Sequence, residues 1–94
     1  MDWNHPYNVA VVTVQEIADG KKPILLVTHD SGHGGWQFMP GGDVSGQKPL
    51  VIPKEDILKI DPSIKEITDL PIGWRAVRST SKSEWIKEPN PDKD

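Results

Sequence analysis

Residues 23–39 read PILLVTHDSGHGGWQFM and decide the fold, because two apolar runs flank one short polar loop. Successive side chains of a strand point to opposite faces, so Leu25, Val27 and His29 share one row and His29 ends it at the rim of the core. In the second run Trp36 and Phe38 share a face. The spacing predicts an antiparallel hairpin whose tip is the polar loop.

The chain before this hairpin predicts one interior strand and one short helix. Residues 8–14 read NVAVVTV and are apolar on both alternating faces, which is typical of a strand covered on both sides. Thr13 and Glu16 have the spacing of a capping box, in which the two side chains bond the free amides at a helix start. We expect one or two helical turns that end at Gly20, where the missing Cβ permits a left-handed residue.

After the hairpin, helical and apolar patterns alternate over short distances. Residues 49–52 form an apolar run, and PKEDILKI at 53–60 predicts a helix with Pro53 in its first turn and acidic residues near its positive end. Asp61-Pro62 ends that helix. Ser63 and Glu66 repeat the capping-box spacing and predict a further short helical piece. Residues 73–79 and 84–87 then predict a closing hairpin.

These patterns together predict an α+β fold with a mainly antiparallel sheet of about five strands and two or three short helices mostly on one face. Residues 1–88 form a single domain, since a 94-residue chain is too short for two cores. Residues 89–94 are expected to be a disordered acidic tail. Trp36 and Trp74 are expected to anchor the sheet against the helices.

Composition narrows the class of function. A net charge of -3 and a pI near 5.5 argue against nucleic acid as a partner, because phosphate binding requires a basic surface. The absence of cysteine removes thiolate chemistry and thiolate metal sites, and no cofactor is expected. The apolar runs are too short to span a bilayer and no export signal is visible, so we expect a cytoplasmic protein without membrane contact.

The polar loop carries the densest group of reactive side chains. His29, Asp30 and His33 offer two imidazoles and a carboxylate, which are ligands for zinc or nickel. Two His residues four apart share a face only in a helix, whereas glycines favour a loop here, and Asp and Ser in loops usually bond backbone amides. A metal-binding protein or metal-assisted enzyme that uses these three residues is therefore the alternative function.

Trp and Arg are enriched at protein interfaces, and Trp74 and Arg75 follow one another near the predicted closing hairpin. Such an aromatic-basic patch is typical of a surface that binds another protein. The competing interpretation is that Trp74 only fills the core.

The order of segments PILLVTHD, GGWQFMPGGD, ILKIDPSIKEITDLPIGWRAVR and SEWIKE resembles a family of short bacterial proteins of unknown function. It is similar, more distantly, to a bacterial domain proposed as an immunity protein in toxin systems. The likeness covers residues 8–88 and rests most on Trp36 with Asp43 beyond it and on the segment from Asp61 to Gly73. The chain departs from the immunity-like pattern at Val44, where that pattern leads us to expect a more acidic residue. The resemblance implies protein binding and no catalytic residue.

The sequence thus favours a non-enzymatic binding module, immunity-protein-like, over an enzyme. Its partner would be another protein, and a domain that works only as an oligomer is a further alternative. The candidate binding residues are His29, Asp30, His33, Trp36, Asp43, Trp74 and Arg75.

Overall fold

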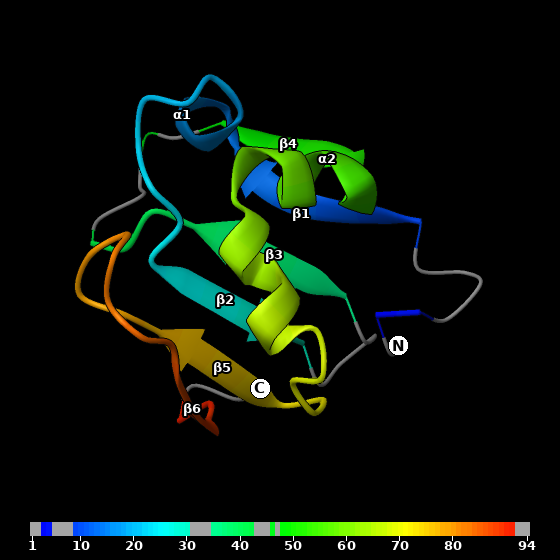
Figure 1. Cartoon of the computed structure of the whole chain (residues 1–94). Coiled ribbons are helices and arrows are strands. Elements are labelled where there is room, and N and C mark those ends of the chain that lie inside the picture. Colours follow the sequence, from blue (N-terminus) through cyan, green and yellow to red (C-terminus); the bar gives the residue numbers. More distant parts are fainter. Residues whose placement is uncertain (1–2, 5–8, 31–34, 43–45, 47, 92–94) are drawn as a thin grey trace.

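The computed structural model describes residues 3–4, 9–30, 35–42, 46 and 48–91 (Figure 1). Six strands, two α-helices and one 3₁₀-helix occur in this part of the chain. In chain order they are β1 (Ala10–Val14), α1 (Gln15–Ala18), β2 (Leu26–His29), β3 (Trp36–Met39), β4 (Pro49–Pro53), α2 (Lys54–Ile60), η1 (Pro62–Ile67), β5 (Trp74–Val77) and β6 (Ile86–Pro89).

All six strands form one sheet in the order β4-β1-β3-β2-β5-β6. The predicted hairpin is confirmed: β2 and β3 are antiparallel, with His29 opposite Trp36. The sheet is mixed, because β1 runs parallel to β3, and its sixth strand is β4, which the sequence showed only as an apolar run. The parallel pair arises because the β2–β3 hairpin inserts β3 beside β1 while β4 pairs with the far side of β1. No short turn connects β1 to β3, so local periodicity could not reveal this pairing.

The helices α2 and η1 pack against one face of the sheet, as Figure 1 shows, and α1 lies at the end of β1 beside α2. One helical layer on one sheet layer confirms the predicted α+β class. Alternate strand residues meet the helices in one core, in which Val27, Trp36 and Phe38 are at most 1% exposed and pack with Ile57 and Ile64. The other residues of the same strands point to the opposite face and are only partly buried.

The capping box predicted at Thr13 is wrong. Thr13 belongs to β1, and its buried hydroxyl donates a 2.8 Å hydrogen bond to the carbonyl oxygen of Phe38 on β3. The helix α1 begins after Val14 without a side-chain cap. Burial decides between the two roles, because a hydroxyl inside the sheet must find a nearby acceptor. The predicted stop at Gly20 is confirmed by its φ of 75°.

The start of η1 also differs from the prediction. Its cap is Asp61, whose carboxylate accepts a 3.0 Å hydrogen bond from the backbone N–H of Ser63, and the helix already begins at Pro62. Pro62 fits the first position because its missing N–H has no partner there in any helix. Pro53 closes β4 and caps α2 rather than lying inside the first turn.

The closing hairpin is confirmed by the antiparallel pairing of β5 and β6. Strand β6 runs through Pro89, and the backbone N–H of Asn90 donates to the carbonyl oxygen of Gly73 at 2.9 Å. The sheet therefore reaches two residues into the expected tail. Residues 92–94 lie outside the described part of the chain.

An ion pair ties the end of the helical layer to the edge strand β6. The Lys87 ammonium lies 2.8 Å from the Asp69 carboxylate and lowers its pKa below the ordinary 3.8. A carboxyl with a lowered pKa stabilises the fold above its unfolded pKa, and this contribution is lost as the pH falls through the folded value. Because Asp69 is exposed, the effect on global stability is small.

We therefore predict the pKa of Asp69 itself. An NMR titration should place it below 3.8, and Lys87→Met should return it to the ordinary range. An unchanged pKa in Lys87→Met would show that the ion pair does not form in solution.

Candidate interaction surface

His29 is part of the core. Its ring is 1% exposed and stacks on Trp36, with ring centroids 4.1 Å apart. The Nδ1 atom lies 2.7 Å from the carbonyl oxygen of Leu70, so Nδ1 carries the hydrogen and donates it. The imidazole thus fixes the chain after η1 to the end of β2. The structure places it inside the core rather than at the rim.

The rest of the predicted loop is only partly described. The backbone N–H of Asp30 donates to the carbonyl oxygen of Gly35 at 2.7 Å and closes the hairpin. His33 and Asp43 lie outside the described residues. In the described part of the chain, no three His, Asp or Glu side chains are grouped to hold a metal ion. The metal hypothesis includes His33 and stays a prediction.

Trp74 and Arg75 do not form one patch. They are neighbours on β5 and therefore point to opposite faces of the sheet. Trp74 packs against the core on the helical side. Arg75 lies on the other side, where its Nε donates a 2.6 Å hydrogen bond to Glu88 of β6.

Arg78 makes the densest polar network among the described residues. Its guanidinium, in a side chain that is 1% exposed, pairs with Asp61 and donates to the Ile24 carbonyl oxygen at 2.9 Å. It also donates to the Ser63 hydroxyl and to a backbone carbonyl of the β5–β6 loop, and it lies 4.0 Å from the Trp85 ring. One side chain thereby connects the start of η1, the entry to β2 and the closing hairpin. No local pattern marks this network, because Arg78 bonds Ser63 and Ile24, which lie 15 and 54 residues away in the chain.

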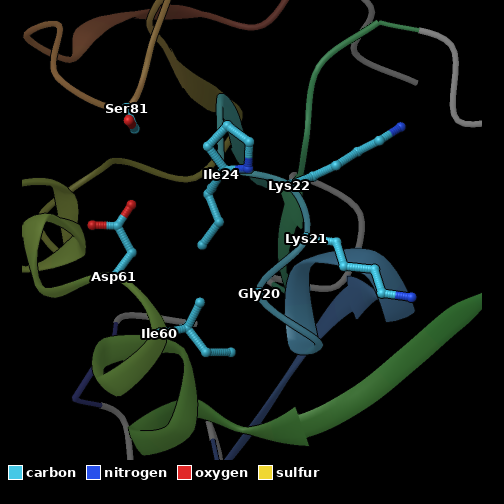
Figure 2. Close-up of a pocket in the computed structure, with 8 residues that line it drawn as sticks. Gly20, Lys21, Lys22, Ile24, Ile60, Asp61 and Ser81 are labelled. Carbon is cyan, nitrogen blue, oxygen red and sulfur yellow. The ribbon is translucent and has the colours of Figure 1, made fainter.

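A pocket of about 430 Å³ opens beside this network (Figure 2). Ile24, Ile60 and Asp61 line it, and Figure 2 shows the side chains of Lys21 and Lys22 pointing away from it. The Asp61 carboxylate is already bonded by Arg78 and Ser63. The Asp61 carboxylate therefore serves the fold.

The face of the sheet opposite α2 and η1 carries two rows of side chains that cross the strands. The first row spans all six strands, as each residue is the register partner of the next. Its middle is polar and its charges cancel in the Arg75–Glu88 ion pair. In order its members are Val51, Val12, Gln37, Thr28, Arg75 and Glu88.

The second row is entirely apolar. Met39 of β3, Leu26 of β2, Val77 of β5 and Ile86 of β6 are successive register partners. The first three side chains are partly exposed, and Ile86 is 59% exposed. A continuous aliphatic strip on a sheet face with an adjacent polar row is the arrangement expected of a contact surface. We call the two rows together the open face.

The alternation of side chains along the strands, which identifies the core residues, also identifies the residues of the open face. Residues 24–29 and 36–39 each present a second row, but only the strand order brings Met39, Leu26, Val77 and Ile86 together. Among the sequence candidates that the structure describes, Arg75 alone belongs to the two rows of the open face.

The chain matches no known family model, and neither curated proteins nor solved structures match it significantly. Fold and surface define its class: an α+β domain with one helical layer on a six-stranded mixed sheet. No helix in the described part of the chain has the length and apolar character needed to cross a membrane.

Proposed function

We propose that this domain is a non-enzymatic interaction module that binds another protein through the open face. The aliphatic strip formed by Met39, Leu26, Val77 and Ile86 carries the proposal. Covering such a strip releases water from it, and the favourable free energy is about 25 cal/mol for each Å² of apolar surface that is buried. The adjacent row supplies hydrogen-bonding groups at Gln37 and Thr28, which give such a contact its orientation.

The chemistry of the His29 region supports the same proposal. His29 and Trp36 are at most 1% exposed and their rings stack, so these two candidate residues shape the hairpin from within. Binding energy at protein interfaces comes from side chains that lose water on contact, and a side chain already buried has little left to lose. The partly exposed residues of the open face meet this condition.

We propose a protein toxin as the partner class, following the resemblance of residues 8–88 to an immunity-like domain. Immunity proteins act by binding and need no catalytic group. The cytoplasm is the proposed location of this complex.

The proposal is tested by comparative capture. The wild-type protein, Val77→Lys and Ile72→Lys are immobilised and exposed to an extract of the native cells. Val77 lies in the aliphatic strip, while Ile72 is a 50% exposed isoleucine outside both rows. We expect the same partner to be retained by wild type and Ile72→Lys and to fall at least about tenfold with Val77→Lys, because a charge would be buried against apolar surface.

Equal capture by Val77→Lys and wild type would overturn the open face as the binding surface. Turnover of a small molecule by the pure protein would overturn the non-enzymatic class.

A further inference from the structure

We infer that the backbone edge of β5 is a second binding site, at which an extended segment of a partner protein replaces β6 and joins the sheet as a strand. The inference goes beyond the proposed function, because it concerns the strand that pairs with β5 and not the open face. Three observations carry it: β6 has no buried side chain, exposed ion pairs hold it, and its release uncovers both backbone groups and two opposite charges.

Strand β6 adds no buried side chain to the core. All four of its residues are exposed or only partly buried, and Ile86 is 59% exposed. The other edge strand, β4, is attached more firmly, because its Ile52 packs against the core and the strand runs directly into α2, where Ile57 is fully buried. Elements with few buried apolar contacts open locally at a lower free energy than the core. Local opening is therefore expected at β6 and not at β4.

Two ion pairs hold β6, one on each side of the sheet. On the helical side the Lys87 ammonium lies 2.8 Å from the Asp69 carboxylate, whose side chain is 78% exposed. On the open face Glu88 pairs with Arg75, and these side chains are 37% and 28% exposed. Ion pairs with this much contact with water add little to stability, and salt weakens them further.

The residue before β6 is anchored in the rest of the fold. The indole N–H of Trp85 donates a 3.2 Å hydrogen bond to the Ser63 hydroxyl, and its ring lies 4.0 Å from the Arg78 guanidinium. Arg78 is itself 1% exposed in its side chain and bonded to the helical layer. The point at which β6 separates from the sheet therefore falls between Trp85 and Ile86.

Release of β6 uncovers a row of backbone groups on β5. The N–H of Asn90 donates to the carbonyl oxygen of Gly73 at 2.9 Å, and this bond fixes the alternation of the pair. Arg75 and Val77 accordingly direct their N–H and C=O groups toward β6. An uncovered edge of this kind accepts an added strand, which satisfies the same groups.

The charges beside this edge define the incoming strand. Release of β6 leaves Arg75 on the open face and Asp69 on the helical side without their ion-pair partners in β6. Neighbouring residues of a strand point to opposite faces, so a segment in the register of β6 matches both charges when a basic residue directly precedes an acidic one. An aliphatic residue before them lies opposite Val77. The occupant is thus an extended segment with the order aliphatic, basic, acidic.

Hydrogen exchange on the full wild-type chain tests the opening of β6. The amides of Ile86 and Glu88 face β5, and we expect their protection factors to be at least about thirtyfold lower than that of Thr28 in the central strand β2. They should also be lower than that of Ile52 in β4. Raising NaCl to about 0.5 M should lower protection in β6 about twofold relative to β4, because salt screens both ion pairs. Equal protection of β6 and β4 would overturn the inference.

Peptide binding tests the class of occupant. The full-length double variant Lys87→Glu/Glu88→Lys places like charges opposite Asp69 and Arg75, which weakens the pairing of its own β6. The probe is the synthetic peptide SEWIKEPN, which has the sequence of residues 83–90, and the matched control SEWIEKPN exchanges its two charges. We expect the probe, at concentrations of about 1–5 mM, to shift the backbone NMR signals of Arg75 and Val77 to saturation. The control should bind at least about threefold more weakly.

Equal binding of the two peptides would overturn the inference, as would the absence of saturable binding of either peptide up to about 5 mM. Circular dichroism checks that the double variant keeps its fold, which is expected because both replaced residues lie on an edge strand without buried side chains. The exchange measurement needs no variant, so it decides against the inference even where the double variant does not fold.

Discussion

Replacing Arg78 by Met is expected to lower the free energy of unfolding by about 3–5 kcal/mol. The variant loses the hydrogen bond to the Ile24 carbonyl oxygen and the pairing with Asp61, whose side chain is 20% exposed. It leaves Oδ2 of that carboxylate and the Ile24 carbonyl oxygen without the Arg78 donor, while Oδ1 keeps its bonds from Ser63, and unpaired buried polar groups are costly. In a domain this small, such a loss is a large part of the total stability.

Urea unfolding followed by tryptophan fluorescence would measure the change. Arg75→Met is the matched control, because the Arg75–Glu88 pair lies on the open face with side chains 28% and 37% exposed, and it should cost less than about 1 kcal/mol. Equal costs for the two variants would contradict the role assigned to Arg78.

Trp36→Ala should have an effect of similar size, about 3–5 kcal/mol, because it removes the largest fully buried side chain of the core. Trp36 stacks on His29 and meets the ring of Trp3 edge to face, with centroids 5.3 Å apart. The cavity left behind would be lined by these rings and by Phe38, which cannot all close on it.

The matched control is Trp74→Ala on the neighbouring part of the sheet. Trp74 is only partly buried, so its replacement should cost clearly less than that of Trp36 in the same urea experiment. A Trp36→Ala variant within about 1 kcal/mol of wild type would mean that the hairpin packs differently from the structure described above.

Local patterns were sufficient to identify most elements and one of the two sheet faces. The alternation around Val27 and Phe38 marks the core correctly, and Gly20 ends its helix as expected. Thr13 shows the limit of such reasoning: its spacing to Glu16 matches a capping box, but the hydroxyl bonds Phe38, 25 residues away. Tertiary contacts decide between two local options of similar energy.

The candidate site was harder to find for a physical reason. Reactive side chains are visible in a sequence, so His29 attracts attention, yet its imidazole is used to bond Leu70, 41 residues later. The open face consists of ordinary aliphatic residues from four strands, and only the order of those strands makes Leu26 and Val77 neighbours. Strand order depends on long-range pairing, which periodicity does not encode.

Photo-crosslinking in native cells would test most directly whether the open face is the contact surface. A photoreactive amino acid is placed at Gln37 in the open face, at Asp30 beside the hairpin loop, or at exposed Lys65 on η1. We predict an adduct to a partner protein from position 37 and none from position 65. Adducts from position 30 without any from position 37 would contradict the account and return recognition to the polar loop.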